Sequence, residues 1–317
     1  MNASGMALKV ASKLPKTSRH LGKSWQEIGG ANLIAPYWNL ESLNVLKKPE
    51  TWVLFAFISP VLAFYLSNPS RERLFIVLMG YFALAWAVCF YVFVAKRRTS
   101  IWIGLATAVF TRLIGRWFGH LLRITILAPF YHINESSTDI LRVIGVFGSY
   151  GFNEELLKDL PVLLLTFVLK RIKTPVDGMF YGAMSGLSFA AWEGYNYLDD
   201  PTKGDALMVA FLRITIGMFM HAAYPAIAGY FIALAVSKRR PSVLCALGIG
   251  IATTLHTLYD IFTATHGPLV VIVVFLVFIA YADRSQRIAS EVGKKEEEIP
   301  TNAQPEIVEV PEVASGA

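Results

Sequence analysis

Long apolar stretches of the length that crosses a bilayer dominate this sequence. A transmembrane helix needs about 20 mainly apolar residues. Candidate stretches lie at 51–67, 73–95, 101–130, 140–170, 177–198, 206–236, 242–263 and 268–283. Hydrophobic residues make up 55% of the 317-residue chain and charged residues 16%, a composition too apolar for a soluble domain of this length. The sequence therefore predicts an all-α fold, a polytopic membrane bundle of about eight transmembrane helices.

The basic residues outside these stretches predict how the bundle sits in the membrane. With eight crossings, both chain ends lie on one side. The loops of that side carry Lys47, Lys48, Lys96, Arg97, Arg98, Lys170, Arg171, Lys173, Lys238, Arg239, Arg240, Arg284 and Arg287, and the opposite loops carry Arg71, Arg73 and Lys203. Because cytoplasmic loops are enriched in lysine and arginine, we expect a multi-pass plasma-membrane protein with both termini in the cytoplasm. The same clusters account for the net charge of +6 without a nucleic-acid partner.

Three regions follow from this pattern. Residues 1–50 form a cytoplasmic lead-in, 51–287 the transmembrane core, and 288–317, rich in charge and proline, a disordered cytoplasmic tail. The absence of sorting signals suits a bacterial or archaeal membrane. Cys89 and Cys245 both lie inside apolar stretches, so we expect neither a structural disulfide nor a cysteine-built zinc site.

Two of the predicted spans are irregular. The 101–130 stretch carries a basic stripe, spaced so that its members share one helical face. The stripe consists of Arg112, Arg116, His120 and Arg123. It faces either the protein interior or a membrane surface, and the second reading would change the span count. In 140–170, glycines precede Asn153, a good N-cap residue, so we expect the helix to break there and to restart at Asn153.

Ionisable side chains inside the apolar stretches are the strongest indication of function. They are Glu154, Glu155, Lys158, Glu193, His221, His256 and Asp260. A charged side chain near the bilayer centre costs roughly 2.5 to 3.5 kcal/mol, so these groups need compensation in a buried polar site. Counted from the predicted cytoplasmic ends, four spans place such a group about 21 to 24 Å into the membrane. The sequence thus predicts one polar layer near the outer face.

Other features near this layer have structural readings. Gly178, Gly182, Gly186, Ala190 and Gly194 recur every fourth residue, which is typical of close helix packing. Lys158, one turn from Glu154, is interpreted as a charge-balancing partner. Asp260, one turn from His256, either forms a structural pair with it or assists catalysis. Arg213 is interpreted as an anchor at the membrane interface.

The ordered motifs of this region resemble a known pattern. Glu154-Glu155-Leu-Leu-Lys158, then Phe189-Ala-Ala-Trp-Glu193, then His221, then His256-Thr-Leu-Tyr-Asp260 resemble the PrsW family of intramembrane proteases. That family is similar to the CAAX prenyl endopeptidases and the bacteriocin-immunity-type membrane proteins. The resemblance covers roughly 145–265. Glu193 stands where the wider superfamily often has His, and Asp260 where it often has Asn; both departures match the PrsW branch.

The resemblance implies hydrolysis of a peptide bond within or beside the bilayer. The family's known role is the first cut of a membrane-anchored anti-sigma factor, so the expected partner is a single-span membrane protein. By position, Glu154 or Glu155 would be the base and His256 with Asp260 would polarise the carbonyl. Glu193 and His221 would orient water or hold a metal.

The sequence leaves open whether the site binds a metal ion. Zinc ligands could come from Glu154, Glu155, Glu193, His221 and His256. No His-Glu-x-x-His helix of the common metalloprotease type is present. Of the two possibilities, zinc or no cofactor, we favour a glutamate that activates water without metal.

Two other classes of function explain the same polar layer. A proton- or cation-coupled transporter also buries glutamate and histidine, although the sequence shows neither paired broken helices nor an internal repeat. A noncatalytic scaffold could bind a partner's transmembrane helix along the glycine ladder.

Overall fold

The computed structural model describes residues 71–134, 138–199, 206–236 and 241–298, with the isolated residues 48, 51 and 55. The chain divides into two compact units, 1–52 and 53–317, and the second is described below. The predicted first span at 51–67, apart from residues 51 and 55, lies outside the described residues. So do nearly all of the 1–50 lead-in and the end of the predicted tail.

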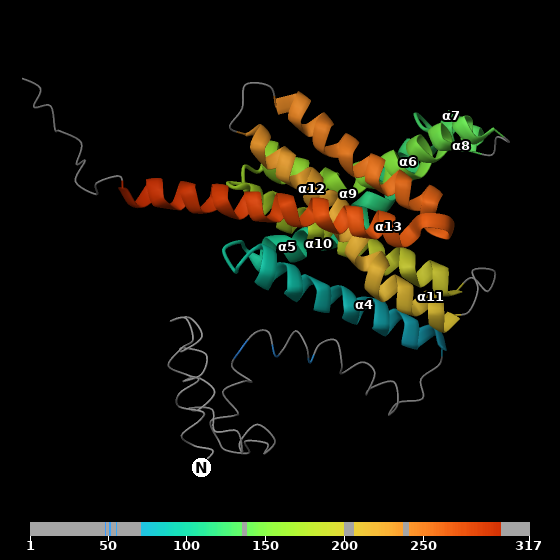
Figure 1. Ribbon diagram of the computed structural model, residues 1–317, viewed down its shortest axis with the longest axis horizontal. Helices are drawn as coiled ribbons and strands as arrows, with labels where there is room; N and C mark the ends of the chain where they lie inside the picture. Colours follow the sequence, from blue (N-terminus) through green and yellow to red (C-terminus); the bar gives the residue numbers. More distant parts are fainter. Residues whose placement is uncertain are drawn as a thin grey trace, which may run out of the picture. The chain divides into compact units, whose positions relative to one another are not determined.

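The described part of the second unit is helical throughout, with no strand in these ranges (Figure 1). Its α-helices are α4 (Arg71–Cys89), α5 (Ile101–Phe110), α6 (Arg116–Ile124), α7 (Ala128–Asn134), α8 (Asp139–Val146), α9 (Asn153–Leu163), α10 (Pro175–Asp199), α11 (Ala206–Leu212), α12 (Met218–Ala235) and α13 (Pro241–Glu298). Short π-helical segments extend or join them at Phe90–Val94, Thr111–Gly115, Phe147–Phe152, Leu164–Val168 and Arg213–Gly217.

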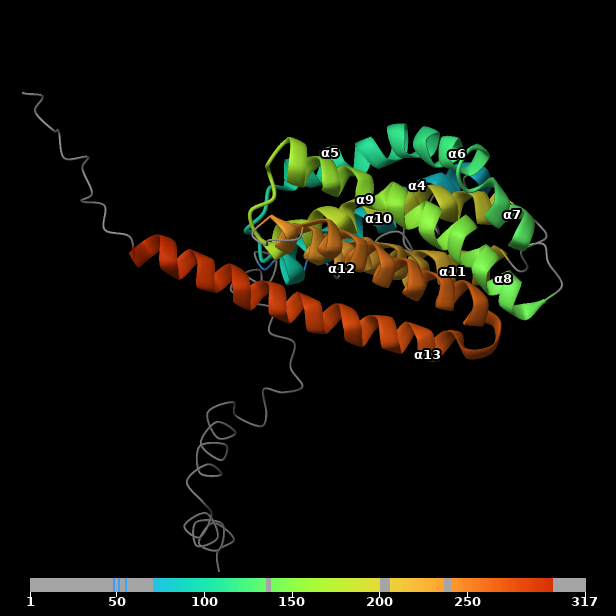
Figure 2. The ribbon, with the colours of Figure 1, turned by 90° about the horizontal axis from the view of Figure 1, so that it is seen from above.

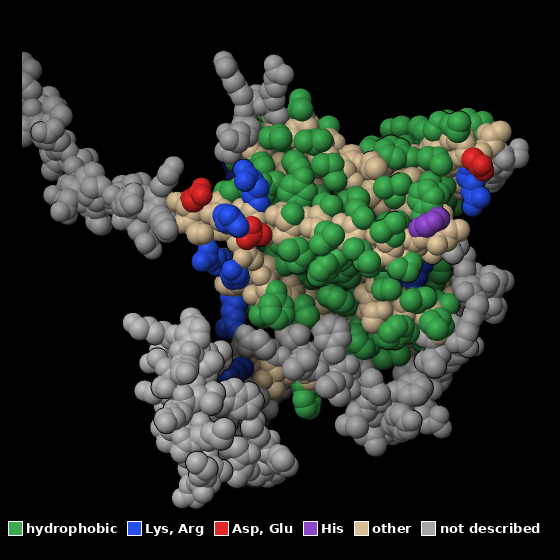
Figure 3. All heavy atoms as spheres, viewed as in Figure 1, with side chains coloured by type: hydrophobic (Ala, Val, Ile, Leu, Met, Phe, Trp, Pro, Cys, Tyr) green, Lys and Arg blue, Asp and Glu red, His purple; other side chains and the backbone are tan. Residues whose placement is uncertain are grey.

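Some of the described helices have the length and composition of membrane spans. Among the described residues, four stretches are long and apolar enough to cross a bilayer: Phe75–Val94, Met208–Ala235, Pro241–Thr263 and Thr265–Val292. Hydrophobic side chains cover most of the face drawn in Figure 3. The predicted class, an all-α membrane bundle, is therefore confirmed, while the count of eight spans stays a prediction.

Two closely packed helices, α10 and α12, form the centre. A Cβ atom added at Gly178, Gly182 or Gly186 would overlap the backbone carbonyl groups of Gly229, Pro225 and His221 respectively. Only glycine permits helix backbones to approach this closely. The predicted ladder is thus packed against α12, and its last member, Gly194, faces Met79 on α4. Figure 2 shows α10 and α12 between helices α5 and α6 on one side and the C-terminal part of α13 on the other.

Several expected boundaries were wrong. The chain does not break before Asn153, because the π-helical segment Phe147–Phe152 joins α8 to α9 and keeps Phe152 helical (φ −69°, ψ −43°). A π-turn takes up an extra residue without ending the helix. Glycines and an N-cap residue in the sequence therefore predicted a break that does not occur. The rod that begins at Ile101 ends at Ile124 rather than at residue 130.

The last two predicted spans lie in α13, which bends at His266 (φ −132°, ψ 20°). Beyond the second span, α13 continues to Glu298, into the range expected to be a disordered tail. Glutamate and lysine dominate its end, and these are good helix formers.

The basic loops gather at one end of the unit. Ser100, next to Lys96–Arg98, donates its backbone N–H to the Tyr181 hydroxyl near the start of α10. Gln286 of α13 donates to the carbonyl of Val94. These contacts place residues 96–98, the 170–173 loop and the end of the second α13 arm on one side, where Figure 3 shows blue Lys and Arg side chains.

Candidate active site

A fully buried lysine on α9 is the centre of a polar network. The Lys158 ammonium lies 2.7 Å from Glu155 Oε1, 3.1 Å from His221 Nδ1 and 3.4 Å from Glu154 Oε2. An ammonium has three N–H donors, so each has an acceptor. Glu154, Glu155 and Lys158 share a helix face because they are three and four residues apart. The structure thus gives Lys158 the charge-balancing position that we expected, shared between two carboxylates.

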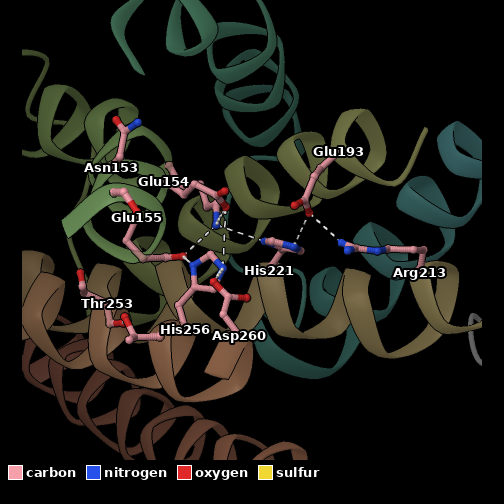
Figure 4. A network of polar contacts seen from close by, with 12 residues as sticks. Asn153, Glu154, Glu155, Glu193, Arg213, His221, Thr253, His256 and Asp260 are labelled. Atoms are coloured by element: carbon pink, nitrogen blue, oxygen red, sulfur yellow. Dashed lines mark hydrogen bonds and ion pairs between the residues drawn. The ribbon is translucent and has the colours of Figure 1, made fainter. Parts of the chain in front are cut away.

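Glu155 and His256 form the buried side of this network (Figure 4). Glu155 Oε1 lies 2.7 Å from His256 Nδ1, and the two side chains are 0% and 4% exposed. Because a carboxylate accepts, Nδ1 carries a hydrogen. The other ring nitrogen, Nε2, then faces Glu154 Oε2 at 3.7 Å and Asp260 Oδ2 at 3.6 Å. Helix α13 thereby presents His256 to two carboxylates on α9.

Glu193 on α10 closes the network on the opposite side. Its Oε2 lies 2.7 Å from His221 Nε2 and 2.8 Å from Arg213 Nη1. Since Lys158 donates to His221 Nδ1, the hydrogen of that ring belongs on Nε2. Arg213 also stacks on the Tyr197 ring, with 3.4 Å between Cζ and the ring centroid. Arg213 therefore binds Glu193, whereas the sequence suggested an interfacial anchor.

Glu154 differs from its neighbour in access. Its side chain is 18% exposed, and it lines a cavity of about 280 Å³, called here the Glu154 pocket. The other lining residues are Gly119, His120, Arg123, Tyr131, Tyr150, Asn153, Leu157, Phe189 and Trp192. Glu155, Glu193 and Asp260 do not line it. Glu193 is as exposed as Glu154, at 18%, and Asp260 more so, at 33%, but Glu154 is the one of the four that lines this cavity, where water and a substrate have room.

The basic stripe of the α5–α6 rod borders this space. His120 and Arg123 line the Glu154 pocket, and the Arg123 guanidinium lies 4.6 Å from the centre of the Tyr131 ring. The Arg112 guanidinium lies 5.8 Å from the centre of the Trp192 ring. Arg112, His120 and Arg123 are all exposed, so the stripe lies at the open rim of these cavities, and its orientation toward a membrane surface or the interior stays a prediction. Nothing is described of the Arg116 side chain.

Asn153 and Tyr224 support the site in ways that the sequence did not indicate. Asn153, expected to be a helix cap, donates to the Tyr131 hydroxyl at 3.1 Å and so fixes a wall of the Glu154 pocket. The Tyr224 ring stacks on His256, with centroids 5.0 Å apart and planes at 16°. Position 224 lies one turn after His221, which is the only signal in the sequence for it.

A zinc ion does not fit this donor set as it is arranged. Among the described residues, Glu154, His221 and His256 form a group whose potential ligand atoms lie within 4.8 Å of one another. However, both ring nitrogens of His221 are engaged, by Lys158 and by Glu193. A dication would also sit beside the Lys158 ammonium, a repulsion that burial strengthens. Glu155 and Glu193, the other predicted ligands, are held by Lys158 and Arg213.

Comparison with known proteins decides the family. A family model described as "PrsW family intramembrane metalloprotease" matches residues 79–282. The chain belongs to this family. The PrsW match extends from α4 to α13, beyond the 145–265 region that carried the resemblance. It makes the chain a membrane peptidase, and it favours this reading over a transporter. No solved structure matches the chain.

Two curated relatives are bacterial PrsW proteins. Protease PrsW of Shouchella clausii (strain KSM-K16) is 28% identical over 150 residues, which are 47% of this chain and 68% of that protein. Protease PrsW of Bacillus subtilis (strain 168) is 31% identical over 137 residues, 42% of this chain and 61% of the relative. The chain is therefore a membrane protein of the bacterial PrsW type.

Proposed function

We propose that Glu154 activates water to hydrolyse a peptide bond in a single-span membrane protein. The observation that carries this assignment is the contrast between adjacent glutamates. Glu154 lines a cavity and is partly exposed, whereas Glu155 is fully buried against Lys158 and His256. A general base must reach the proton that it takes, and Glu154 meets this condition.

Amide hydrolysis at this site needs no group beyond water and the side chains described. The Glu154 carboxylate takes a proton from water as the oxygen attacks the peptide carbonyl carbon. The tetrahedral intermediate carries an oxyanion. Glu154 then returns the proton to the leaving nitrogen as the C–N bond breaks, which releases a carboxylic acid and an amine. The acid then passes its proton to the amine, so the products are a carboxylate and an ammonium and Glu154 is a carboxylate again.

His256 is the candidate donor to the oxyanion. Its Nδ1–H is fixed on Glu155, so a protonated ring presents Nε2–H toward Glu154 and Asp260. Preorganised donors of this kind stabilise charge that develops in the transition state. In this proposal, the Asp260 carboxylate keeps the His256 ring in its orientation. Glu193, His221 and Lys158 position the Glu154 carboxylate through the chain of contacts described above.

The substrate class and the membrane side are part of the same proposal. A membrane-anchored protein of the anti-sigma-factor type is the substrate that the PrsW relationship suggests. The basic loops gather at one end of the unit, and the positive-inside rule makes that end cytoplasmic. The polar layer then lies closer to the outer face.

A proteomic comparison of membranes tests the proposal. Cells carrying the active protein should contain a fragment of a single-span protein that disappears with Glu154→Gln, because Gln keeps the shape but cannot take a proton. The matched variant Glu155→Gln should leave some cleavage but lower the melting temperature, since it removes an acceptor of the buried Lys158. Normal processing in the Glu154→Gln strain would exclude Glu154 as the base.

A further inference from the structure

A second cavity lies beside the Glu154 pocket, and the proposed mechanism gives it no role. This lateral groove, about 500 Å³ in volume, is bounded by α4, α5 and α10. Its lining residues are Ile76, Met79, Gly80, Ala83, Leu84, Ala87, Leu105, Ala108, Arg112, Met184, Leu187, Ser188, Ala191, Trp192 and Tyr195. Nearly all are apolar, as expected for a surface that meets lipid or an apolar helix.

The groove has the small side chains that let another helix approach. Gly80, Ala83 and Ala87 lie on one face of α4, and Ala108, Ser188 and Ala191 line the other walls. A Cβ atom added at Gly80 would meet no atom within 4 Å, so the glycine opens onto free space. The glycines Gly178, Gly182 and Gly186 of α10 are covered by α12. Gly80 of α4, by contrast, has no described helix against it. Small residues at helix interfaces permit tight packing in membranes.

The groove leads to the candidate base. A narrow cavity of about 10 Å³ lies between the groove and the Glu154 pocket, lined by Thr111, Arg112, Leu157, Ser188, Phe189 and Trp192. Trp192 lines all three cavities, Arg112 and Ser188 line the first two, and Leu157 and Phe189 line the last two. Trp192 is therefore the residue that the lateral groove and the Glu154 pocket share, and Arg112 lines the groove next to it.

From these features we infer that the lateral groove docks the transmembrane helix of the substrate, whose cleaved bond reaches Glu154 past Trp192. The inference rests on the proposed protease function. Along α4, Ile76 to Ala87 spans about 16 Å, roughly half of a 30 Å hydrocarbon core. The groove thus holds about half of a spanning helix. The segment that continues past Trp192 must leave the helical conformation, because a cavity of about 10 Å³ does not admit a helix.

Photo-crosslinking tests which molecule occupies the groove. A photoreactive amino acid replaces Leu84, which is 59% exposed in the groove, or Ile272, which is 55% exposed on α13 and serves as the control. Both are placed in the Glu154→Gln protein, and the probe is the single-span protein found in the proteomic comparison. We expect a crosslink to this protein from position 84 and at least tenfold less from position 272. A crosslink from position 84 only to residues 51–67 of the same chain, or only to lipid, would overturn the inference.

A groove-filling substitution gives a second, independent readout. Gly80→Phe should reduce cleavage of the probe at least tenfold, while Gly250→Phe should leave it unchanged. Gly250 is the matched control, because a Cβ added there also meets nothing within 4 Å and it lies on α13, away from the groove. Both variants should keep the melting temperature of the parent, since a phenylalanine at either site enters open space.

These outcomes separate the inference from the proposed function. Cleavage by the parent protein together with full activity of Gly80→Phe would refute docking in the groove and leave Glu154 in place. If no single-span fragment depends on Glu154, the proposed function itself fails.

Discussion

At the scale of single residues, the site is a set of charges that hold each other in fixed positions. Two carboxylates and one imidazole surround the Lys158 ammonium, and Arg213 holds Glu193 on the far side. Buried charges are tolerated when they are paired and hydrogen-bonded. The pairing also distinguishes neighbours in sequence: Glu155 is locked in the network, whereas Glu154 reaches a cavity.

Removing the central cation should destabilise the protein through the charges left behind. Lys158→Met should lower the free energy of unfolding by about 3–5 kcal/mol, the usual cost of breaking a buried ion pair from one side. Adding Glu155→Gln to Lys158→Met should restore part of that loss, because one uncompensated carboxylate is then removed. Thermal unfolding of the two single variants and the double variant in detergent measures the coupling. Additive losses would mean that the two side chains do not interact.

The arrangement of ligand atoms also predicts how the enzyme responds to chelators. Because His221 has no free ring nitrogen and Lys158 occupies the space between the potential ligands, we expect metal-free protein to keep cleaving the membrane substrate at the rate of untreated protein. The measurement combines elemental analysis of the purified protein with a cleavage assay. Loss of activity on chelation, restored by one zinc ion per chain, would contradict the arrangement described here.

At the scale of helices, the fold was predictable where apolar length decides it. The stretches expected at 177–198 and 206–236 correspond to α10 and to the rod from α11 to α12. The shared level of Glu154, Glu193, His221 and His256 also followed from counting residues, and their side chains do form one network.

What sequence reasoning missed depends on contacts between helices. Arg213 lies 8 residues before His221 (221 − 213), which in an α-helix would turn it about 80° away from the histidine after two full turns. The π-helical segment Arg213–Gly217 has wider turns and reduces this offset, so both side chains reach the same carboxylate of Glu193. Adjacent glutamates likewise look alike in sequence, and only the neighbouring helices decide that Glu155 is buried.

The crossing of α10 and α12 predicts a local sensitivity to side-chain size. In Gly186→Leu, the new side chain would overlap the carbonyl of His221 and displace the α12 backbone at the site. Since a shift of about 1 Å can cost on the order of 100-fold in rate, we expect that loss in a cleavage assay. Gly250→Leu, the same substitution in open space, should keep parental activity. Equal activity of the two variants would show that α12 does not pack on Gly186.

At the scale of the whole molecule, the uneven distribution of basic side chains predicts one orientation. We replace the two native cysteines and introduce single cysteines at exposed positions near opposite ends of the unit. Asp139→Cys should react with an impermeant thiol reagent added to intact cells, whereas Arg171→Cys should react only after the membrane is opened. The reverse pattern would place the Glu154 pocket near the cytoplasm.

The contact between Gly178 and Gly229 has a consequence for how this sequence can evolve. A Cβ atom added to either residue would overlap the carbonyl oxygen of the other, and neither can be made smaller to accommodate a change in its partner. No second substitution at this pair can therefore rescue a first, and natural drift should leave both positions unchanged. Because these two helices cannot separate by even a single methyl group, we expect α10 and α12 to move together as one body in any conformational change of the protein.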